Sequence, residues 1–134
     1  MQLKIEDTVV VNADKNDILI VSFLEAIYDD EKNAIQAQAG AEKCFALIAE
    51  KGFSTPAKVI VDLRPMGSKS HISPKAREVY MKFVSDQRIA KVAVLGSSDA
   101  QVSIANFILT FTGDLGAKLA WFSSEAEARY WIQK

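Results

Sequence analysis

Basic and hydroxyl side chains gather in one short stretch, RPMGSKSHIS, which covers residues 64–73 and contains the only histidine of the chain. An aliphatic run ending at Asp62 precedes this loop, and Ser73-Pro74 follows it as a helix start, because serine caps helices and proline suits the first helical position. Cationic groups beside the free N–H groups of a helix start favour anions. Together with the next strand end, this predicts a ligand site comprising Arg64, Lys69, Ser70, His71, Ser97 and Ser98.

Nucleophilic catalysis is a weaker interpretation of the same loop. A serine beside His71, with Asp62 orienting the imidazole, would be a minimal hydrolase site. No GxSxG motif accompanies it, so a hydrolase is the third and least favoured function. One histidine and one distant cysteine give no metal-ligand spacing, and we expect neither a metal nor a cofactor.

The composition is that of a folded domain, with 49% hydrophobic and 25% charged residues in a chain of 134. We therefore expect one domain over residues 1–134. The N-terminal sequence lacks the order of a signal peptide, and no apolar run approaches the ~20 residues that span a bilayer. The single cysteine fits a reducing compartment, so we predict a cytoplasmic protein without an integral membrane segment.

Charge is unevenly distributed, although the net charge is only −1 and gives no general attraction for nucleic acid. Residues 1–50 carry 4 basic and 10 acidic side chains, whereas residues 58–91 carry 8 basic and 3 acidic ones. The contrast indicates either two solvated faces of opposite sign or an anionic partner near residues 64–91.

Hydrophobic periodicity alternates between strand and helix along the chain. We expect strands over residues 3–12 and 17–24, antiparallel across a turn at 13–16, and further strands over 58–63, 91–96 and 116–122. Helices are expected over 31–51, from Ser73, over 100–112 and from Ser124. This order predicts an α/β fold with a mixed, mainly parallel sheet, N-terminal antiparallel edge strands and about four helices.

Two groups in or near the first helix have simple structural interpretations. Cys44 falls on its apolar stripe with Ala37, Ala41 and Ile48, which favours a small buried hydrophobe over a nucleophile. The acidic run at residues 29–31 reads as a helix start with favourable dipole placement, not as an acid/base pair.

The segment over residues 100–112 is apolar on nearly every face, so it is either enclosed in the core or offers an outer face to a partner. Its candidate interaction surface is Phe107, Ile108 and Phe111, for dimerisation, an acyl chain or a membrane surface. Core packing is the alternative for this surface and for the other aromatic residues of the last third: Trp121, Phe122, Tyr130 and Trp131.

Three stretches give the chain a resemblance to the STAS domain, the sulphate transporter and anti-sigma factor antagonist fold: VIVDLRPMG, RIAKVAVLG and WFSSEAEARYWI. Within that fold it is most similar to the bacterial STAS/CRAL-TRIO-like proteins. The resemblance implies a non-catalytic module, often controlled by phosphorylation of a serine at the start of the second helix. Ser73 holds that position, but the Asp-Ser-Ser-Gly signature of the regulated members is missing, so Ser73 is a phosphorylation candidate by position alone.

The function expected from these observations is a non-catalytic STAS-like regulatory or docking module in the cytoplasm, with an unknown protein partner or a second copy of itself. The alternative is a carrier or sensor of a small apolar, lipid-like or anionic ligand, held between the second and third helices and possibly membrane-peripheral.

Overall fold

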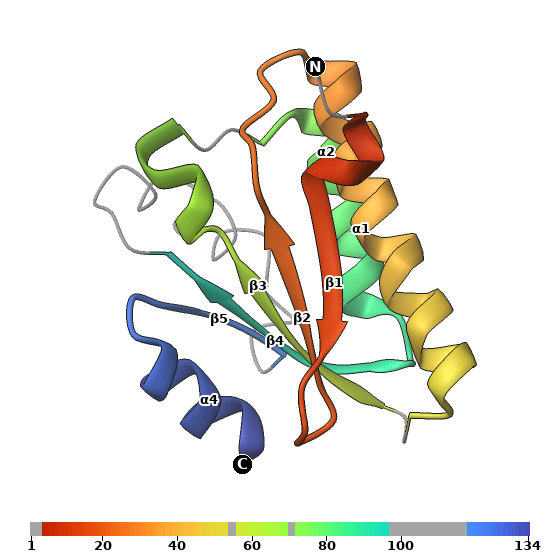
Figure 1. Ribbon diagram of the computed structural model, residues 1–134, viewed down its shortest axis with the longest axis vertical. Coiled ribbons are helices and arrows are strands. Elements are labelled where there is room, and N and C mark those ends of the chain that lie inside the picture. The colour runs from red at the N-terminus through yellow and green to blue at the C-terminus, as the bar shows by residue number, and fades with distance from the viewer. Residues whose placement is uncertain (1–3, 54–55, 70–71, 97–117) are drawn as a thin grey trace.

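The computed structural model describes residues 4–53, 56–69, 72–96 and 118–134, with the backbone alone over residues 67–69 (Figure 1). Five strands and three α-helices lie in these ranges, together with two short 3₁₀ helices. In chain order they are η1 (Ile5–Thr8), β1 (Val9–Ala13), β2 (Ile18–Phe23), α1 (Asp30–Lys51), β3 (Ala57–Asp62), η2 (Arg64–Lys69), α2 (Pro74–Ser85), β4 (Ile89–Leu95), β5 (Leu119–Phe122) and α4 (Glu125–Gln133).

The five strands form one sheet in the order β1-β2-β3-β4-β5. β1 and β2 are antiparallel, and every other neighbouring pair is parallel. The turn between β1 and β2 is held by Asp14, whose Oδ1 accepts hydrogen bonds from the backbone N–H groups of Asn16 at 2.8 Å and Ile18 at 3.1 Å. The predicted mixed sheet with an antiparallel N-terminal edge is confirmed.

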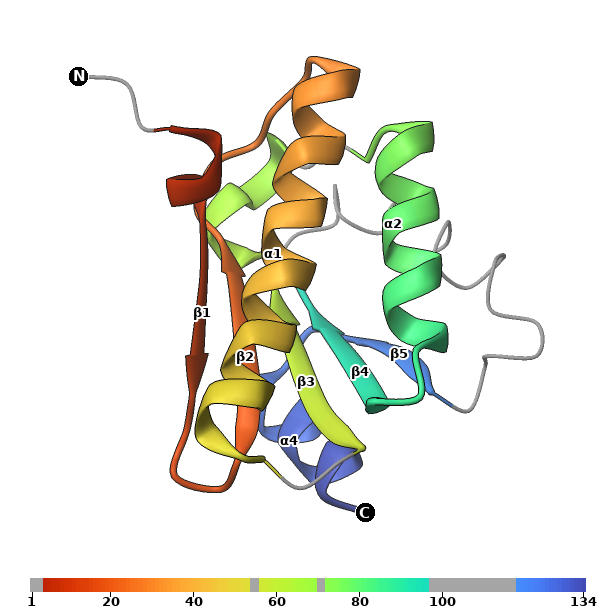
Figure 2. The same ribbon diagram turned by 90° about the vertical axis from the view of Figure 1, so that its right-hand side faces the viewer.

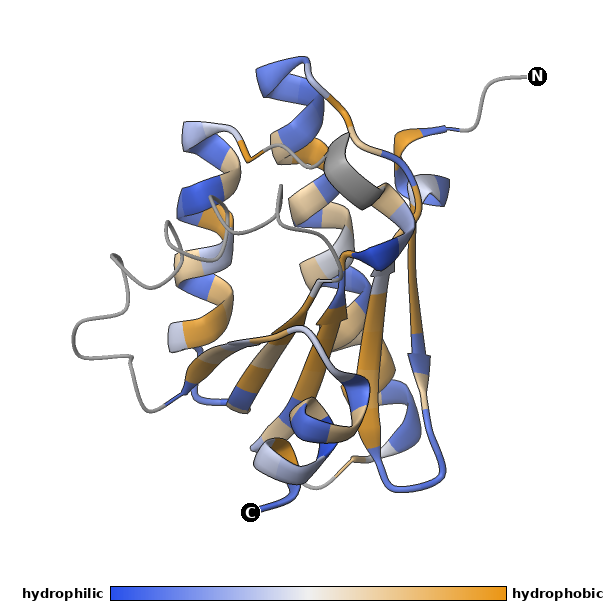
Figure 3. Ribbon diagram, turned by 90° about the vertical axis from the view of Figure 1, so that its left-hand side faces the viewer, coloured by the Kyte–Doolittle hydropathy of each residue, from blue (hydrophilic) through white to orange (hydrophobic). Residues whose placement is uncertain are grey.

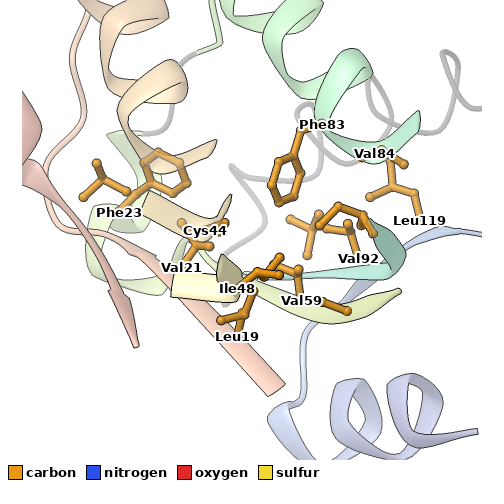
Figure 4. Close-up of a cluster of buried hydrophobic side chains, with 14 of the residues drawn as sticks. Leu19, Val21, Phe23, Cys44, Ile48, Val59, Phe83, Val84, Val92 and Leu119 are labelled. Carbon is orange, nitrogen blue, oxygen red and sulfur yellow. The ribbon is translucent and has the colours of Figure 1, made fainter. Parts of the chain in front are cut away.

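Helices cover both faces of the sheet, with α1 and α2 side by side on one face and α4 on the other (Figures 1 and 2). β3 is the central strand, and its successive side chains point to opposite faces. Val59 joins the larger apolar cluster beneath α1 and α2, which Figure 4 shows, whereas Ile60 joins a smaller cluster beneath α4. The continuous apolar sequence of β3 therefore reflects burial on both sides, and Figure 3 shows that hydrophobic residues predominate in the strands of the sheet.

Both ends of α1 follow from local sequence. The side chain of Asp29 accepts a hydrogen bond from the backbone N–H of Lys32 at 2.9 Å, so the acidic run is a helix start as predicted. Gly52 ends the helix in the left-handed conformation with φ of 66°, and its N–H bonds to the Ile48 carbonyl. Glycine adopts this conformation without the steric cost that other L-residues incur.

Two predictions need correction, and one lies outside the described residues. The strand expected over residues 3–12 is too long, because residues 5–8 form η1 and the strand begins only at Val9. Within η1 the hydroxyl of Thr8 donates a hydrogen bond to the Ile5 carbonyl at 2.5 Å. Tyr130 is not core but 67% exposed. The helix expected over 100–112, with Phe107, Ile108 and Phe111, falls outside the described ranges.

Candidate functional site

The candidate site lies at the carboxyl edge of the sheet, where β2, β3, β4 and β5 end and η2, α1, α2 and α4 begin. Arg64 opens η2 directly after β3, and Ser73 precedes α2. The side chain of Lys69 and four further predicted ligand residues lie outside the described part of the chain: Ser70, His71, Ser97 and Ser98. Their joint role in binding an anion stays a prediction.

Arg64 is held by two carboxylates. Its Nε donates to Oδ1 of Asp62 and its Nη2 to Oδ2, each at 3.0 Å, and the same Nη2 donates to Oε1 of Glu125 at 2.9 Å. These hydrogen bonds raise the pKa of Arg64 above its ordinary value, with Asp62 the larger cause. An incoming anion would therefore compete with two carboxylates for this guanidinium.

The same contacts bear on the hydrolase interpretation. That interpretation has Asp62 orienting His71, but both carboxylate oxygens of Asp62 bond to Arg64, and Oδ1 also accepts the Arg64 backbone N–H at 3.0 Å. The local cause is the Asp-x-Arg spacing at the end of β3, which lets the arginine fold back on the aspartate in the bidentate geometry that guanidinium and carboxylate favour.

An alternating chain of charges continues from Arg64 into α4. Glu125 bonds to Arg129 one helical turn later at 3.0 Å, and Arg129 reaches Asp14 in the β1–β2 turn at 2.6 Å. Hydrogen bonds from Arg129 and Arg64 lower the pKa of Glu125. The pKa of Asp14 is also lowered, because its hydrogen bonds outweigh the opposing effect of burial. The network ties α4 to both the end of β3 and the hairpin turn, so it has a clear structural role.

Ser73 is a fully buried helix cap. Its hydroxyl oxygen accepts a hydrogen bond from the Ala76 N–H at 3.1 Å, and its own N–H donates to Oδ1 of Asn33 at 2.9 Å. The predicted Ser-Pro helix start is confirmed. Phosphorylation of Ser73 stays a prediction, and a kinase would reach this hydroxyl only after the start of α2 had opened.

Two buried amides on α1 organise this edge and were missed in the sequence. Asn33 is 4% exposed and donates from Nδ2 to the Ile27 carbonyl at 2.9 Å, besides accepting from Ser73. Gln36 is 3% exposed and donates to Oγ1 of Thr8 at 3.0 Å and to the Glu25 carbonyl at 2.9 Å. Their burial could have been predicted from their positions on an amphipathic helix. Asn33 lies one turn before Ala37 and Gln36 lies immediately before it, so both are on the buried side.

A small apolar pocket lies between α1, α2 and the sheet, with a volume of about 20 Å³. This is room for about one water molecule. Cys44 lines it and is fully buried, and burial raises the pKa of the thiol to about 12, so the prediction of a buried small hydrophobe is confirmed (Figure 4). The other lining residues are Val21, Phe23, Ala37, Gly40, Ala41, Val61, Tyr80 and Phe83.

Apolar side chains also reach the surface at the same edge. In the loop between β2 and α1, Leu24 is 40% exposed and Tyr28 is 60% exposed. The acidic residues around them, on the loop and the first turn of α1, are also exposed: Glu25, Asp29, Asp30 and Glu31.

Other kinds of site find no support in the described residues. Over the ranges that the structure describes, no three or more histidine, cysteine, aspartate or glutamate side chains come together in a way that would hold a metal ion. Among the same residues, none of the helices has the length and apolar character needed to cross a membrane.

Comparison with known proteins identifies the fold. No family model matches the sequence, and no curated protein matches it. The structure is similar to the crystal structure of an uncharacterized protein of the DUF3478 family, with a SpoIIAA-like fold, from Shewanella loihica PV-4. The TM-score is 0.54 at 16% sequence identity, and the similarity covers 92% of this chain and 91% of the other. The chain thus has the SpoIIAA-like, STAS-type fold expected from its sequence.

Proposed function

We propose that this chain, with its SpoIIAA-like fold, is a non-catalytic regulatory or docking module in the cytoplasm, and that its protein partner binds the loop between β2 and α1. One observation carries the proposal. Several described polar side chains at the carboxyl edge bond to one another, and Leu24 and Tyr28 lie exposed among carboxylates at the same edge.

The polar contacts argue against catalysis by the described residues. A catalytic base or nucleophile needs a lone pair directed at the substrate. Asp62 is engaged by Arg64, and the Ser73 hydroxyl accepts the N–H of Ala76 in a fully buried position. Asn33 and Gln36 use their amides to fix the neighbouring loops. These groups make a rigid platform, which suits recognition of a folded partner.

The exposed groups specify the chemistry of the partner. Tyrosine contributes large contact areas to protein interfaces, with little loss of side-chain entropy. Carboxylates around Tyr28 favour basic residues on the other protein and would accelerate association at low salt. We therefore propose a partner with an apolar contact point surrounded by lysine or arginine.

Site-specific photo-crosslinking in cells tests the docking surface. A benzoylphenylalanine at position 28 should give a discrete adduct. The same residue at position 130 is the control and should not give this adduct, because Tyr130 is similarly exposed but lies on α4. The captured protein should then bind the purified chain more weakly at high salt than at low salt. It should also bind the Glu25→Lys variant more weakly than the wild-type chain. Equal adducts from both positions, or binding insensitive to salt and to Glu25→Lys, would contradict the proposal.

The carrier function is the second candidate, because the pocket beside Cys44 is lined mainly by aliphatic and aromatic side chains. Its volume is far below the roughly 300 Å³ or more of ordinary ligand pockets, so a lipid would have to displace α2 from the sheet. Native mass spectrometry of the purified chain distinguishes the two functions. Bound lipid would favour the carrier, and the bare mass of the chain would favour the docking module.

A further inference from the structure

Three neighbouring strands carry a lysine at the amino edge of the sheet, opposite the docking loop. Lys58 lies near the start of β3, Lys91 near the start of β4, and Lys118 directly before β5. The register makes Lys58 and Lys91 direct partners across β3 and β4, and the backbone N–H of Val92 donates to the Lys118 carbonyl at 2.6 Å. Three cationic side chains therefore leave neighbouring strands at this edge.

Two of the three lysines share the face of the sheet that α4 covers. Successive side chains of a strand point to opposite faces, so residues two apart point to the same face. Ile60 and Ala93, two residues beyond Lys58 and Lys91, both belong to the buried cluster beneath α4. Lys58 and Lys91 therefore lie side by side on this face, and both are half-buried.

No described carboxylate neutralises this pair. Lys91 Nζ donates to the Trp131 carbonyl at 3.3 Å and lies 4.9 Å from the centre of the Trp131 ring, two contacts that hold the ammonium group without cancelling its charge. Over the described ranges, neither Lys58 nor Lys91 forms an ion pair. Asp14 and Asp86, in loops at the same edge, are each bonded to an arginine. The pair thus keeps two positive charges.

The spacing of the strands makes this arrangement unfavourable in the free chain. Neighbouring strands lie about 4.8 Å apart, and like charges at facing positions destabilise a sheet. An anion bound between the two ammonium groups would offset the repulsion. A carboxylate or a sulfate ester brings one negative charge, whereas a phosphate monoester brings about −1.5 to −2 at neutral pH and matches the pair. Lysine suits this group, because its ammonium is a compact charge with three donors.

We propose that Lys58 and Lys91 form a binding site for the phosphate group of a phosphate monoester, on the face of the sheet that α4 covers. Lys91 is positioned for it by Trp131, and Lys58 brings the second ammonium from β3. The site goes beyond the docking function and uses the opposite edge of the sheet. Either can therefore fail while the other stands.

Titration with phenyl phosphate at low salt, followed by backbone amide chemical shifts, tests the site. The shifts should saturate around residues 58 and 91, and phenyl sulfate, a tetrahedral anion with one charge, should bind about threefold more weakly or worse. Lys58→Gln should raise the dissociation constant of phenyl phosphate about fivefold. Lys118→Gln is the matched control, because Lys118 Nζ donates to the Asp86 carbonyl at 3.4 Å in the loop between α2 and β4, and its effect should be much smaller.

Stability separates a binding role of Lys58 from a structural one. Without ligand and at low salt, Lys58→Gln should raise the thermal midpoint, because it removes the repulsion of Lys91, although it weakens binding. A lower midpoint would contradict the repulsion on which the site rests and would overturn the proposal.

Three binding results would also overturn the proposal: no saturable shift in the millimolar range, equal affinity for phenyl sulfate and phenyl phosphate, or equal losses from Lys58→Gln and Lys118→Gln. The last two would show only a diffuse attraction to a positive edge. A short peptide with phosphoserine between alanines separates the sources of the phosphate group. Tighter binding than phenyl phosphate would assign it to a phosphorylated protein and weaker binding to a small ester, and either result supports the site.

Discussion

Asn33→Ala is the most informative single change, because one buried amide joins three segments of the candidate site. Its Oδ1 accepts the Ser73 N–H at the start of α2, and its Nδ2 donates to the Ile27 carbonyl in the β2–α1 loop, both at 2.9 Å. Alanine removes both partners and leaves a buried donor and a part-buried acceptor without them. An unsatisfied buried group costs about 1–3 kcal/mol.

We therefore expect Asn33→Ala to lower the free energy of unfolding by about 2–4 kcal/mol. For a domain of this size that corresponds to a fall of roughly 10 °C in the thermal midpoint. Urea unfolding followed by circular dichroism measures the loss. Gln38→Ala is the matched control on the same helix, because the Gln38 side chain is exposed and its hydrogen bond to Glu42 lies on the surface, so the effect should stay within about 0.5 kcal/mol.

Hydrogen exchange locates the effect. The amides of Ala76 and Arg77 bond to the side chain and backbone of Ser73, so Asn33→Ala should lower their protection more than that of β4. An Asn33→Ala variant as stable as Gln38→Ala would refute the reasoning. Uniform loss of protection over α2 and β4 would show that the amide acts on global stability and not on the site.

Three further outcomes are expected. Gly52→Ala should lower the free energy of unfolding by about 1–2 kcal/mol, since the position has φ of 66°; an unchanged urea midpoint would contradict this. Cys44 should react with a thiol reagent only in urea, because burial raises its pKa to about 12, and rapid labelling of the folded chain would disagree. Asp86 has its pKa lowered to about 2 by hydrogen bonds from Arg88, and the pKa of Glu125 is also lowered. These two carboxyl groups therefore take up protons at a higher pH in the unfolded chain than in the folded one. The stability that they contribute at neutral pH should decline as the pH falls from about 5 toward 2. Urea midpoints that stay constant over this pH interval would contradict the prediction.

Local sequence was sufficient to predict most of the elements. Asp29, Gly52 and Ser73 mark helix ends through contacts within a few residues, so their roles can be read from the chain alone. The change from period two to period 3.6 after residue 30 separates the hairpin from α1. The error at residues 3–12 arose because β-propensity favours the apolar residues there, whereas a local Thr8–Ile5 hydrogen bond forms η1 instead.

The candidate site was predictable only in position. The predicted order of strands and helices puts Arg64 and Ser73 at the carboxyl edge of the sheet, as the structure has them, and ligands of open α/β sheets bind beyond this edge. The partners of these residues depend on long-range packing. Glu125 reaches Arg64 from 61 residues away, and Asn33 reaches Ser73 from 40.

By itself, the sequence determined most of the strands and helices that the structure describes and most of the apolar faces that they bury, because hydrophobic periodicity and capping act over a few residues. Only the tertiary structure decided which polar groups remain available. It bonds Arg64 to Asp62 and Glu125 and buries Ser73 against Asn33. Hydrogen bonding is short-ranged and directional, so the availability of a side chain depends on neighbours that the linear chain does not reveal.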